Sequence, residues 1–416
     1  MTPHSRKQVL LSAYACEPDK GSEPGVGWRW AKGLASRVDL HVLTRESNRT
    51  AIENALASLP SDSPLKSAIF MYHDLSKPWL WLKKRGLLPT MAYYTLWQWT
   101  ACRRFARLAD EADVIHHLTF CTLLCPGFWK PKKAKFVIGP VGAPLVNPHY
   151  YSLFGPQERL QRLRGWLMER YHWVPWLDQL LKRASAIIPA NSDTKQLLEK
   201  RPYRIQETML DTGAPESSIA TASGSPDGVF RMMYAGQLER RKGLELSLRA
   251  LARVSTSSVL PWEFHIFGIG PDMKRLQSLA QELKIAEQVI FHGAVPQSEL
   301  MNRFGQMDAF LFTSIRDTSA GVNLEAMANG LPIICIAHQG VADITDDASA
   351  ERVEPGTIDV IVQALADSII RLAENPTRRQ QMGVSAAMRA KTKFSWNEKF
   401  DRMVHVYEEA IGRTSA

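Results

Sequence analysis

The chain has 416 residues, of which 45% are hydrophobic and 22% are charged, and its net charge is +9. This composition excludes a disordered chain, and the length exceeds what one hydrophobic core supports, so we expect two domains. The apolar runs are too short for a signal peptide or a membrane span, which predicts a cytoplasmic protein. The five cysteines lack the spacing of a zinc site, so we expect reduced thiols and neither a metal nor another cofactor.

The positive charge is concentrated in the first half of the chain. Residues 1–200 contain 28 Lys and Arg against 16 Asp and Glu, whereas residues 201–416 contain 23 against 26. Such an imbalance indicates that the first half faces an anionic partner, either nucleic acid or a membrane surface. Nucleic acid is not expected, because no segment resembles a nucleic-acid-binding motif.

Short apolar runs alternate with helical patterns through the first 200 residues. A glycine-rich loop from Gly21 to Gly27 follows the first run and leads into a helix at 28–37. The alternation of strands and helices favours a parallel sheet. The predicted buried strands are 9–15, 38–44, 113–119, 135–142 and 185–192.

A second α/β pattern starts after TASGSPDG (221–228), which has the small, polar composition of a linker. Its predicted strands are 230–237, 263–270, 288–293, 309–314 and 332–337, and its helices are 243–254, 272–283, 298–307 and 323–330. We therefore expect an α/β fold of two Rossmann-like, doubly wound domains that face each other across a cleft. The expected boundaries are 1–213 and 214–395, with a C-terminal helix (396–416) packing back on the N-terminal domain.

The segment RDTSAGVNLEAMANGLP (316–332) places two carboxylates, Asp317 and Glu325, around a run of small residues. Taken alone, it predicts a loop and a core helix with both acids in solvent. After a parallel strand, however, Asp317 would lie at the carboxyl edge of the sheet and Glu325 in the first helical turn facing the cleft. Unblocked N–H groups at a helix start favour an anion. These groups belong to Ser319, Ala320, Gly321 and Val322.

On these segments the chain resembles glycosyltransferase family 4, whose members are retaining, nucleotide-sugar-dependent enzymes of GT-B architecture. Asp317 and Glu325 occupy the two acidic positions of the family's Glu-x7-Glu motif. YAGQLERRKGLELSLRAL contains a segment similar to the family's phosphate-binding loop, starting at Gly236 and with Lys242 in its lysine position. IFGIGPDMKRL and QVIFHGAVPQSELMNRF, which contain Gly268 and Gly293, are similar to segments around the nucleotide base. The resemblance implies no obligatory metal.

Three positions depart from the family pattern. Gln237 stands where the loop usually has Arg, and Arg241 is the candidate to supply that charge. Asp317 is one methylene shorter than Glu, and Ser319 and Ala320 replace the usual Phe-Gly. These changes are compatible with diphosphate chemistry, but they leave the identity of the sugar open.

Two further groups have competing structural explanations. His116 and His117 follow the strand at 113–115, where a histidine is often a core residue; we favour a contact between one of them and the sugar, with the register open. Gly21, Gly25 and Gly27 could serve ordinary turns, but after a first strand they favour close backbone approach to a phosphate or acceptor.

The expected reaction moves a hexosyl group from a nucleotide diphosphate sugar to an acceptor hydroxyl with retention. Arg241 and Lys242 would neutralise the diphosphate, Glu325 would bind the ribose and Asp317 the sugar hydroxyls. The alternatives are a GT-B epimerase or phosphorylase, or a non-catalytic nucleotide-sugar-binding protein.

The acceptor side carries the positive charge. Residues 77–107 contain seven basic residues, no acidic ones and four tryptophans, Trp79, Trp81, Trp97 and Trp99; residues 159–176 have a similar composition. A core helix would explain buried tryptophans. Tryptophan beside Lys and Arg also suits an anionic bilayer surface. We predict peripheral attachment to the cytoplasmic membrane face and a lipid-linked acceptor glycan.

Overall fold

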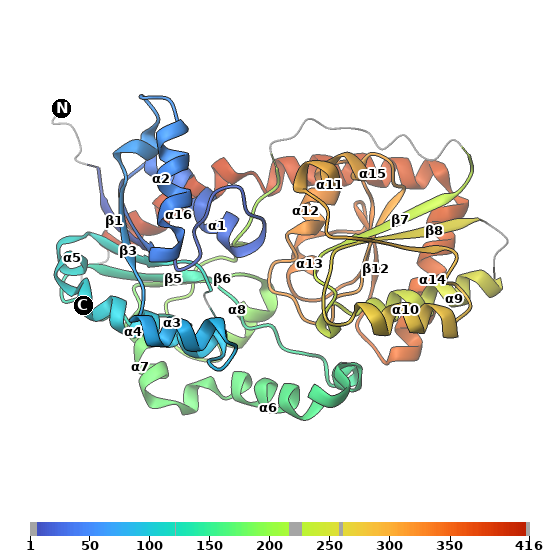
Figure 1. Ribbon diagram of the computed structural model, residues 1–416, viewed down its shortest axis with the longest axis horizontal. Helices are drawn as coiled ribbons and strands as arrows, with labels where there is room; N and C mark the ends of the chain where they lie inside the picture. The colour runs from blue at the N-terminus through green and yellow to red at the C-terminus, as the bar shows by residue number, and fades with distance from the viewer. Residues whose placement is uncertain (1–5, 121, 216–226, 258–260, 413–416) are drawn as a thin grey trace.

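The computed structural model describes residues 6–120, 122–215, 227–257 and 261–412, which form two α/β domains placed side by side (Figure 1). Each domain contains a six-stranded parallel sheet flanked by helices. This arrangement confirms the predicted fold class of two doubly wound domains. Most of the predicted linker 221–228 lies outside the described residues, and the domain boundaries stay predictions.

The N-terminal sheet has the strand order β3-β2-β1-β4-β5-β6. Its strands are β1 (Gln8–Ser12), β2 (Asp39–Arg45), β3 (Ile69–His73), β4 (Val114–His117), β5 (Lys135–Val141) and β6 (Ala186–Pro189). Its helices are α1 (Ser22–Ala35), α2 (Arg49–Ser58), α3 (Lys77–Lys84), α4 (Thr90–Arg104), α5 (Ala106–Glu111), α6 (Glu158–Glu169), α7 (Pro175–Arg183) and α8 (Ser192–Glu199). All five predicted strands are present.

The C-terminal sheet has the order β12-β11-β10-β7-β8-β9. Its strands are β7 (Phe230–Ala235), β8 (Trp262–Phe267), β9 (Val289–Gly293), β10 (Ala309–Phe312), β11 (Ile333–Ile336) and β12 (Ala350–Val353). Its helices are α9 (Leu244–Ser257), α10 (Met273–Glu282), α11 (Gln297–Phe304), α12 (Val322–Ala328), α13 (Gln339–Ile344), α14 (Ile358–Glu374) and α15 (Pro376–Lys393). Every predicted element of this half is present.

The predicted loop from Gly21 to Gly27 is wrong, because α1 already begins at Ser22. Gly25 and Gly27 therefore lie inside the helix, where they allow close packing rather than a turn. A Cβ at Gly25 would lie 1.9 Å from the carbonyl oxygen of Lys20, and one at Gly27 would lie 1.9 Å from that of Ala15. These glycines hold α1 against the segment that follows β1.

The last helix, α16 (Trp396–Gly412), returns to the N-terminal domain and lies beside α1 (Figure 1). The ring of Trp30 on α1 packs 5.9 Å from Trp396 and 5.4 Å from Phe400, measured between centroids. Tyr407 is fully buried in the same apolar cluster. The chain thus crosses between the domains a second time.

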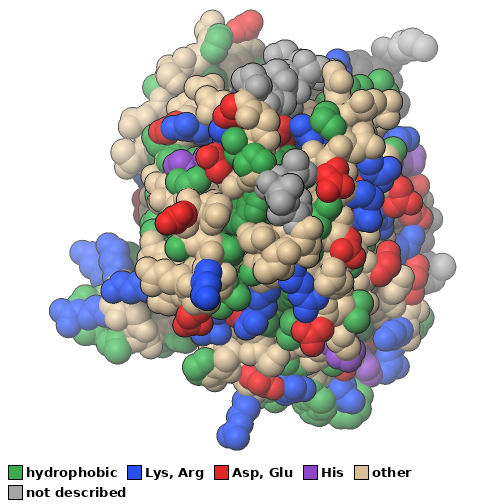
Figure 2. All heavy atoms as spheres, turned by 90° about the vertical axis from the view of Figure 1, so that its right-hand side faces the viewer, with side chains coloured by type: hydrophobic (Ala, Val, Ile, Leu, Met, Phe, Trp, Pro, Cys, Tyr) green, Lys and Arg blue, Asp and Glu red, His purple; other side chains and the backbone are tan. Residues whose placement is uncertain are grey.

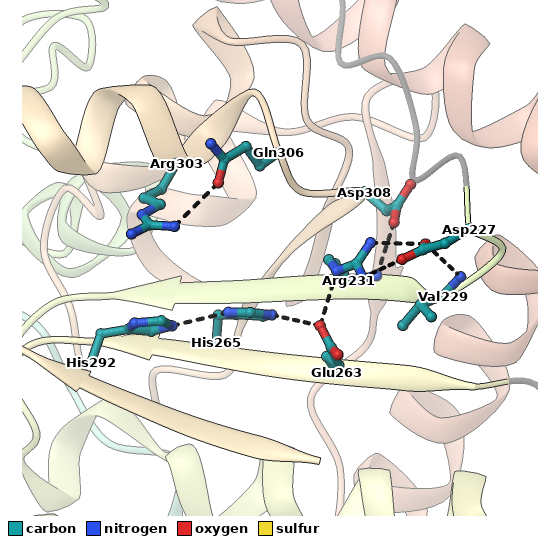
Figure 3. A network of polar contacts seen from close by, with 9 residues as sticks. All are labelled: Asp227, Val229, Arg231, Glu263, His265, His292, Arg303, Gln306 and Asp308. Carbon is teal, nitrogen blue, oxygen red and sulfur yellow. Dashed lines mark hydrogen bonds and ion pairs between the residues drawn. The ribbon is translucent and has the colours of Figure 1, made fainter.

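A polar network joins the neighbouring strands β7, β8 and β9 (Figure 3). Arg231 forms ion pairs with Asp227 (2.6 Å) and with Glu263 (2.9 Å). The carboxylate of Glu263 also contacts His265 Nε2 at 3.1 Å, and His265 Nδ1 lies 3.0 Å from His292 Nε2.

Among the described helices, none combines the length and hydrophobicity needed to cross a bilayer.

Candidate active site

Three glycines bring bare backbone to the carboxyl ends of β7, β8 and β9. The N–H of Gly236 donates to Phe267 O at 2.9 Å, and the N–H of Gly268 donates to Gly293 O at 2.7 Å. All three have positive φ, at +150°, +138° and +72° in chain order. A Cβ at Gly268 would lie 1.8 Å from Gly236 O, so only glycine allows this approach. The backbones that follow β7 and β8 therefore pack directly against each other.

The loop after Gly236 packs against the residues that follow β10. A short 3-10 turn spans Arg240–Lys242 and ends at Gly243, which adopts a left-handed conformation. The carbonyl of Arg241 accepts hydrogen bonds from the N–H groups of Ile315 (2.9 Å) and Arg316 (3.2 Å). Two motifs separated by about 75 residues in the sequence are therefore held together.

Lys242 and Asp317 form an ion pair in which the ammonium donates to Asp317 Oδ2. Both side chains are largely buried, with exposed fractions of 13% and 18%. Burial opposes ionisation of Asp317, but the ammonium of Lys242 outweighs it, and the pKa of Asp317 is lowered. The carboxylate is therefore ionised at neutral pH. The structure brings together the lysine and the first acid that the sequence singled out.

Two further arginines, which the sequence did not single out, join Arg241 at this site. Burial lowers the pKa of Arg164 on α6, and the charge of Arg241 lowers it further. Burial lowers the pKa of Arg316 to about 10, with Arg164 and Arg241 contributing. Arg241 itself pairs with Glu239 at 2.5 Å. Guanidinium groups from both domains therefore share a poorly solvated region, which suits a multiply charged anion.

Arg316 could have been identified from the sequence, because it directly precedes Asp317. Arg164 lies in no motif that would have identified it. Arg316 also donates to the side-chain oxygen of Gln161 on α6. Arg164 donates to the carbonyl of Pro144 at 3.4 Å. Helix α6 of the N-terminal domain thus contacts the segment 316–332 of the C-terminal domain.

Glu325 lies in the first turn of α12, as the sequence predicted, and is partly buried. Burial raises the pKa of its carboxyl group, while Gln297 Nε2, 3.4 Å away, acts in the opposite direction. Gly321 is the N-cap of the helix, and a Cβ there would lie 2.7 Å from the side chain of Thr212. Ser319, Ala320, Gly321 and Val322 therefore form the turn where the donor motif meets the segment that leads in from the N-terminal domain.

The two histidines have different environments, although both are fully buried. His116 uses both ring nitrogens, with Nδ1 2.6 Å from Tyr407 Oη and Nε2 2.6 Å from Gly139 O. The structure therefore places His116 in the core rather than at a sugar. His117 Nε2 lies 3.0 Å from Tyr94 Oη, and its Nδ1 has no hydrogen-bond partner in the described part of the chain. His117 is the remaining candidate.

Two acids between the domains were also missed by the sequence reasoning. Glu23, in the first turn of α1 between Gly21 and Gly25, accepts a hydrogen bond from the N–H of Phe120 at 3.2 Å. Burial raises the pKa of Glu23 to about 8, and the nearby Asp211 contributes. Burial likewise raises the pKa of Asp211. The helix start around Gly21 therefore supplies a buried carboxyl group near Asp211, in addition to close backbone packing.

Comparison with known proteins finds a family model that matches the C-terminal half of the chain. Residues 217–389 match the model of glycosyl transferases group 1. The chain is 26% identical over 414 residues to a D-inositol 3-phosphate glycosyltransferase of Thermomonospora curvata, covering 93% of this chain and 90% of that protein. It is also 29% identical over 179 residues to the GDP-mannose-dependent alpha-(1-6)-phosphatidylinositol monomannoside mannosyltransferase of Mycolicibacterium smegmatis. This match covers 41% of this chain and 45% of that protein.

The chain spans about half the length of most curated relatives it matches. Among solved structures, Anabaena HepE in complex with UDP has a TM-score of 0.61 at 14% identity, with 97% of this chain and 99% of that chain covered. The fold is thus the GT-B architecture of glycosyltransferases. More particularly, residues 217–389 of the C-terminal half match glycosyl transferases group 1, in agreement with the family that the motifs resembled.

Proposed function

We propose that the protein is a retaining glycosyltransferase that moves a hexosyl group from a nucleotide diphosphate sugar to an acceptor hydroxyl. The observation that carries this proposal is the cluster of Lys242, Arg241, Arg164 and Arg316 beside the bare strand ends. Charges preorganised in a poorly solvated cleft stabilise a departing diphosphate more than they would in water. A match to glycosyl transferases group 1 supports the same chemistry.

The Lys242–Asp317 ion pair suggests how the donor is received. A bound diphosphate becomes the new partner of the Lys242 ammonium, and Asp317 is then free to accept hydrogen bonds from sugar hydroxyls. Glu325 binds the ribose. His117 contacts the sugar; the support for this role is its buried Nδ1, which has no hydrogen-bond partner among the described residues. Backbone groups complete the donor site at Gly236, Gln237, Gly268, Gly293 and the turn 319–322.

The acceptor is a lipid-linked or surface-polysaccharide precursor, presented at the cytoplasmic membrane face. Six tryptophans of the N-terminal domain are 43–63% exposed beside basic residues: Trp79, Trp81, Trp99, Trp166, Trp173 and Trp176. Such side chains favour the boundary between anionic headgroups and acyl chains. Trp97, in contrast, is fully buried, and Lys83 points inward to Tyr14, so neither belongs to this surface.

Product analysis with a panel of UDP and GDP sugars tests the reaction. A transferase releases nucleoside diphosphate only when an acceptor glycan is present, and the new linkage keeps the anomeric configuration of the donor. An epimerase would convert the donor sugar without release, a phosphorylase would yield a sugar phosphate, and a binding protein would leave the donor unchanged. Any of these three results contradicts the proposal.

Liposome flotation tests the membrane surface. Binding to vesicles rich in phosphatidylglycerol should fall with salt and with Lys84→Glu/Arg85→Glu, because each basic residue contributes about 1 kcal/mol of attraction near the surface. Lys274→Glu/Lys284→Glu makes the same charge change at exposed positions of the C-terminal domain and is the control. Protein that stays in the soluble fraction at low salt contradicts membrane attachment.

A further inference from the structure

Two cations of the N-terminal domain share one aromatic ring outside the donor site. Arg45 is the last residue of β2, and Lys83 lies in the last turn of α3. The Arg45 guanidinium lies 4.8 Å, and the Lys83 ammonium 5.5 Å, from the ring centroid of Tyr14. Lys83 Nζ also donates to Tyr14 Oη at 2.9 Å. The two positive charges thus converge on one side chain at the end of β1.

No carboxylate of the described residues forms an ion pair with either cation. Glu46, which directly follows Arg45, pairs with Arg49 instead. The oxygens of Asp74, after β3, accept hydrogen bonds from Tyr93 Oη at 3.0 Å and from Ser47 N at 3.3 Å. Burial lowers the pKa of Lys83, and the charge of Arg45 lowers it further, against the opposing effect of Asp74. Two like charges held together in a half-buried place create a strong preference for an anion.

The pair lies at the carboxyl end of the N-terminal sheet. Tyr14 follows β1, Arg45 ends β2, and ligands of parallel sheets bind at these carboxyl ends. The Tyr14 ring lies 4.9 Å from that of Tyr94, and Tyr94 Oη lies 3.0 Å from His117 Nε2. Buried aromatic side chains therefore connect the cation pair to the histidine proposed for the sugar.

We propose that Arg45 and Lys83 bind a phosphate group of the acceptor substrate. That the ligand is an acceptor rests on the proposed transferase function; the anion site itself rests on the contacts above. The ring faces of Tyr14 and Tyr93 hold the ammonium of Lys83 in place, and the Tyr93 centroid lies 4.4 Å from Lys83 Nζ. A phosphate would accept hydrogen bonds from both cations and balance their charge, whereas a neutral glycan would leave that charge unbalanced.

Calorimetric titration of inorganic phosphate tests the site in protein whose donor site is saturated with UDP or GDP. Lys83→Met and Arg45→Gln should each weaken phosphate binding about tenfold or more, since each removes a charge-assisted contact. Lys66→Met removes an equivalent charge from an exposed position of the same domain and should leave phosphate binding unchanged. Arg45→Lys, which keeps the charge, should retain part of the affinity.

The outcomes separate the two proposals. The affinity for UDP or GDP is measured first, without phosphate, and reports on the donor site alone. If neither nucleotide binds, the result counts against the proposed function and not against the anion site. Unchanged phosphate binding in both Lys83→Met and Arg45→Gln, with folding verified by circular dichroism, overturns the inference. Competition that is lost in Lys83→Met then identifies the source of the phosphate. Competition by glucose 1-phosphate indicates a soluble source, and competition by polyprenyl phosphate in detergent indicates a lipid source.

Discussion

The two domains have the same architecture but organise their chemistry differently. In the C-terminal domain, the candidate donor residues lie between residues 236 and 325 and follow consecutive strand ends. On the face of that domain turned to the viewer in Figure 2, acidic and basic side chains are interspersed. In the N-terminal domain, Tyr14, Arg45, Lys83 and His117 come from four separate elements, and exposed tryptophans lie among basic residues. Short motifs therefore define the proposed donor side, whereas tertiary structure assembles the proposed acceptor side.

The largest effect is expected at Lys242. Lys242→Ala should reduce kcat by about a hundredfold or more, the scale of a lost transition-state charge stabiliser, and Arg241→Ala should have a smaller effect. Initial rates of nucleoside diphosphate release measure both. Lys274→Ala, on the exposed side of α10, is the matched control. An unchanged kcat in Lys242→Ala would remove the basis for a diphosphate clamp in the C-terminal domain.

Glycine substitutions distinguish packing from conformation at the strand ends. Gly268→Ala should reduce the free energy of unfolding by about 2 kcal/mol or more, because the new Cβ meets the backbone of Gly236. Gly293→Ala also has positive φ, but nothing lies within 4 Å of its Cβ, so we expect a smaller loss of about 1 kcal/mol. Urea denaturation measures both. Equal losses would contradict the close approach of β7 and β8.

The two acids of the donor motif should separate in their effects. Glu325→Ala should weaken nucleoside diphosphate binding about tenfold, because the ribose loses a charge-assisted partner. Asp317→Ala should leave nucleotide affinity nearly unchanged and lower kcat, because its partner is the sugar. Calorimetric titration and steady-state rates provide the two measurements. A similar loss of bare nucleotide affinity in both variants would rule out this division.

Acid should destabilise the N-terminal domain through its buried histidines. Burial lowers the pKa of His116 to about 4 and that of His117 to about 3. In the unfolded chain a histidine has a pKa of about 6.5. Below that pH the unfolded chain takes up protons that the folded chain does not, so the free energy of unfolding falls as the pH decreases. Each histidine should cost about 1 kcal/mol between pH 6.5 and 5.5. Histidine Hε1 shifts that titrate near pH 6.5 for both residues in the folded protein would contradict this account.

The sequence predicted most of the fold because buried parallel strands are continuous apolar runs. It missed β3 and β12, each of which lies at one edge of its sheet. Ile69 of β3 is 53% exposed, and β12 contains Glu351 and Arg352, so neither strand has the pattern of a buried one. It also placed the start of α1 too late, since glycines that permit close helix packing resemble glycines of a loop.

The sequence identified the donor residues better than the acceptor residues for a related reason. Lys242 and Asp317 sit in motifs whose local spacing follows from one strand and one turn. Arg164 and Lys83 reach their positions only through packing of α6 and α3, so neighbouring residues carry no signal of it. The pair His116 and His117 could not be resolved before the strand register was known, because alternate residues of a strand point to opposite faces.

The division between the domains is tested most directly by the affinity for a nucleoside diphosphate, UDP or GDP, in two variants of the full chain. Lys242→Ala should weaken this binding by about tenfold or more, because a phosphate loses its ammonium partner, whereas Lys83→Met should leave it unchanged. Isothermal titration calorimetry gives both dissociation constants under the same conditions. Unchanged binding in Lys242→Ala, or an equal loss in Lys83→Met, would contradict the assignment of the donor to the C-terminal domain.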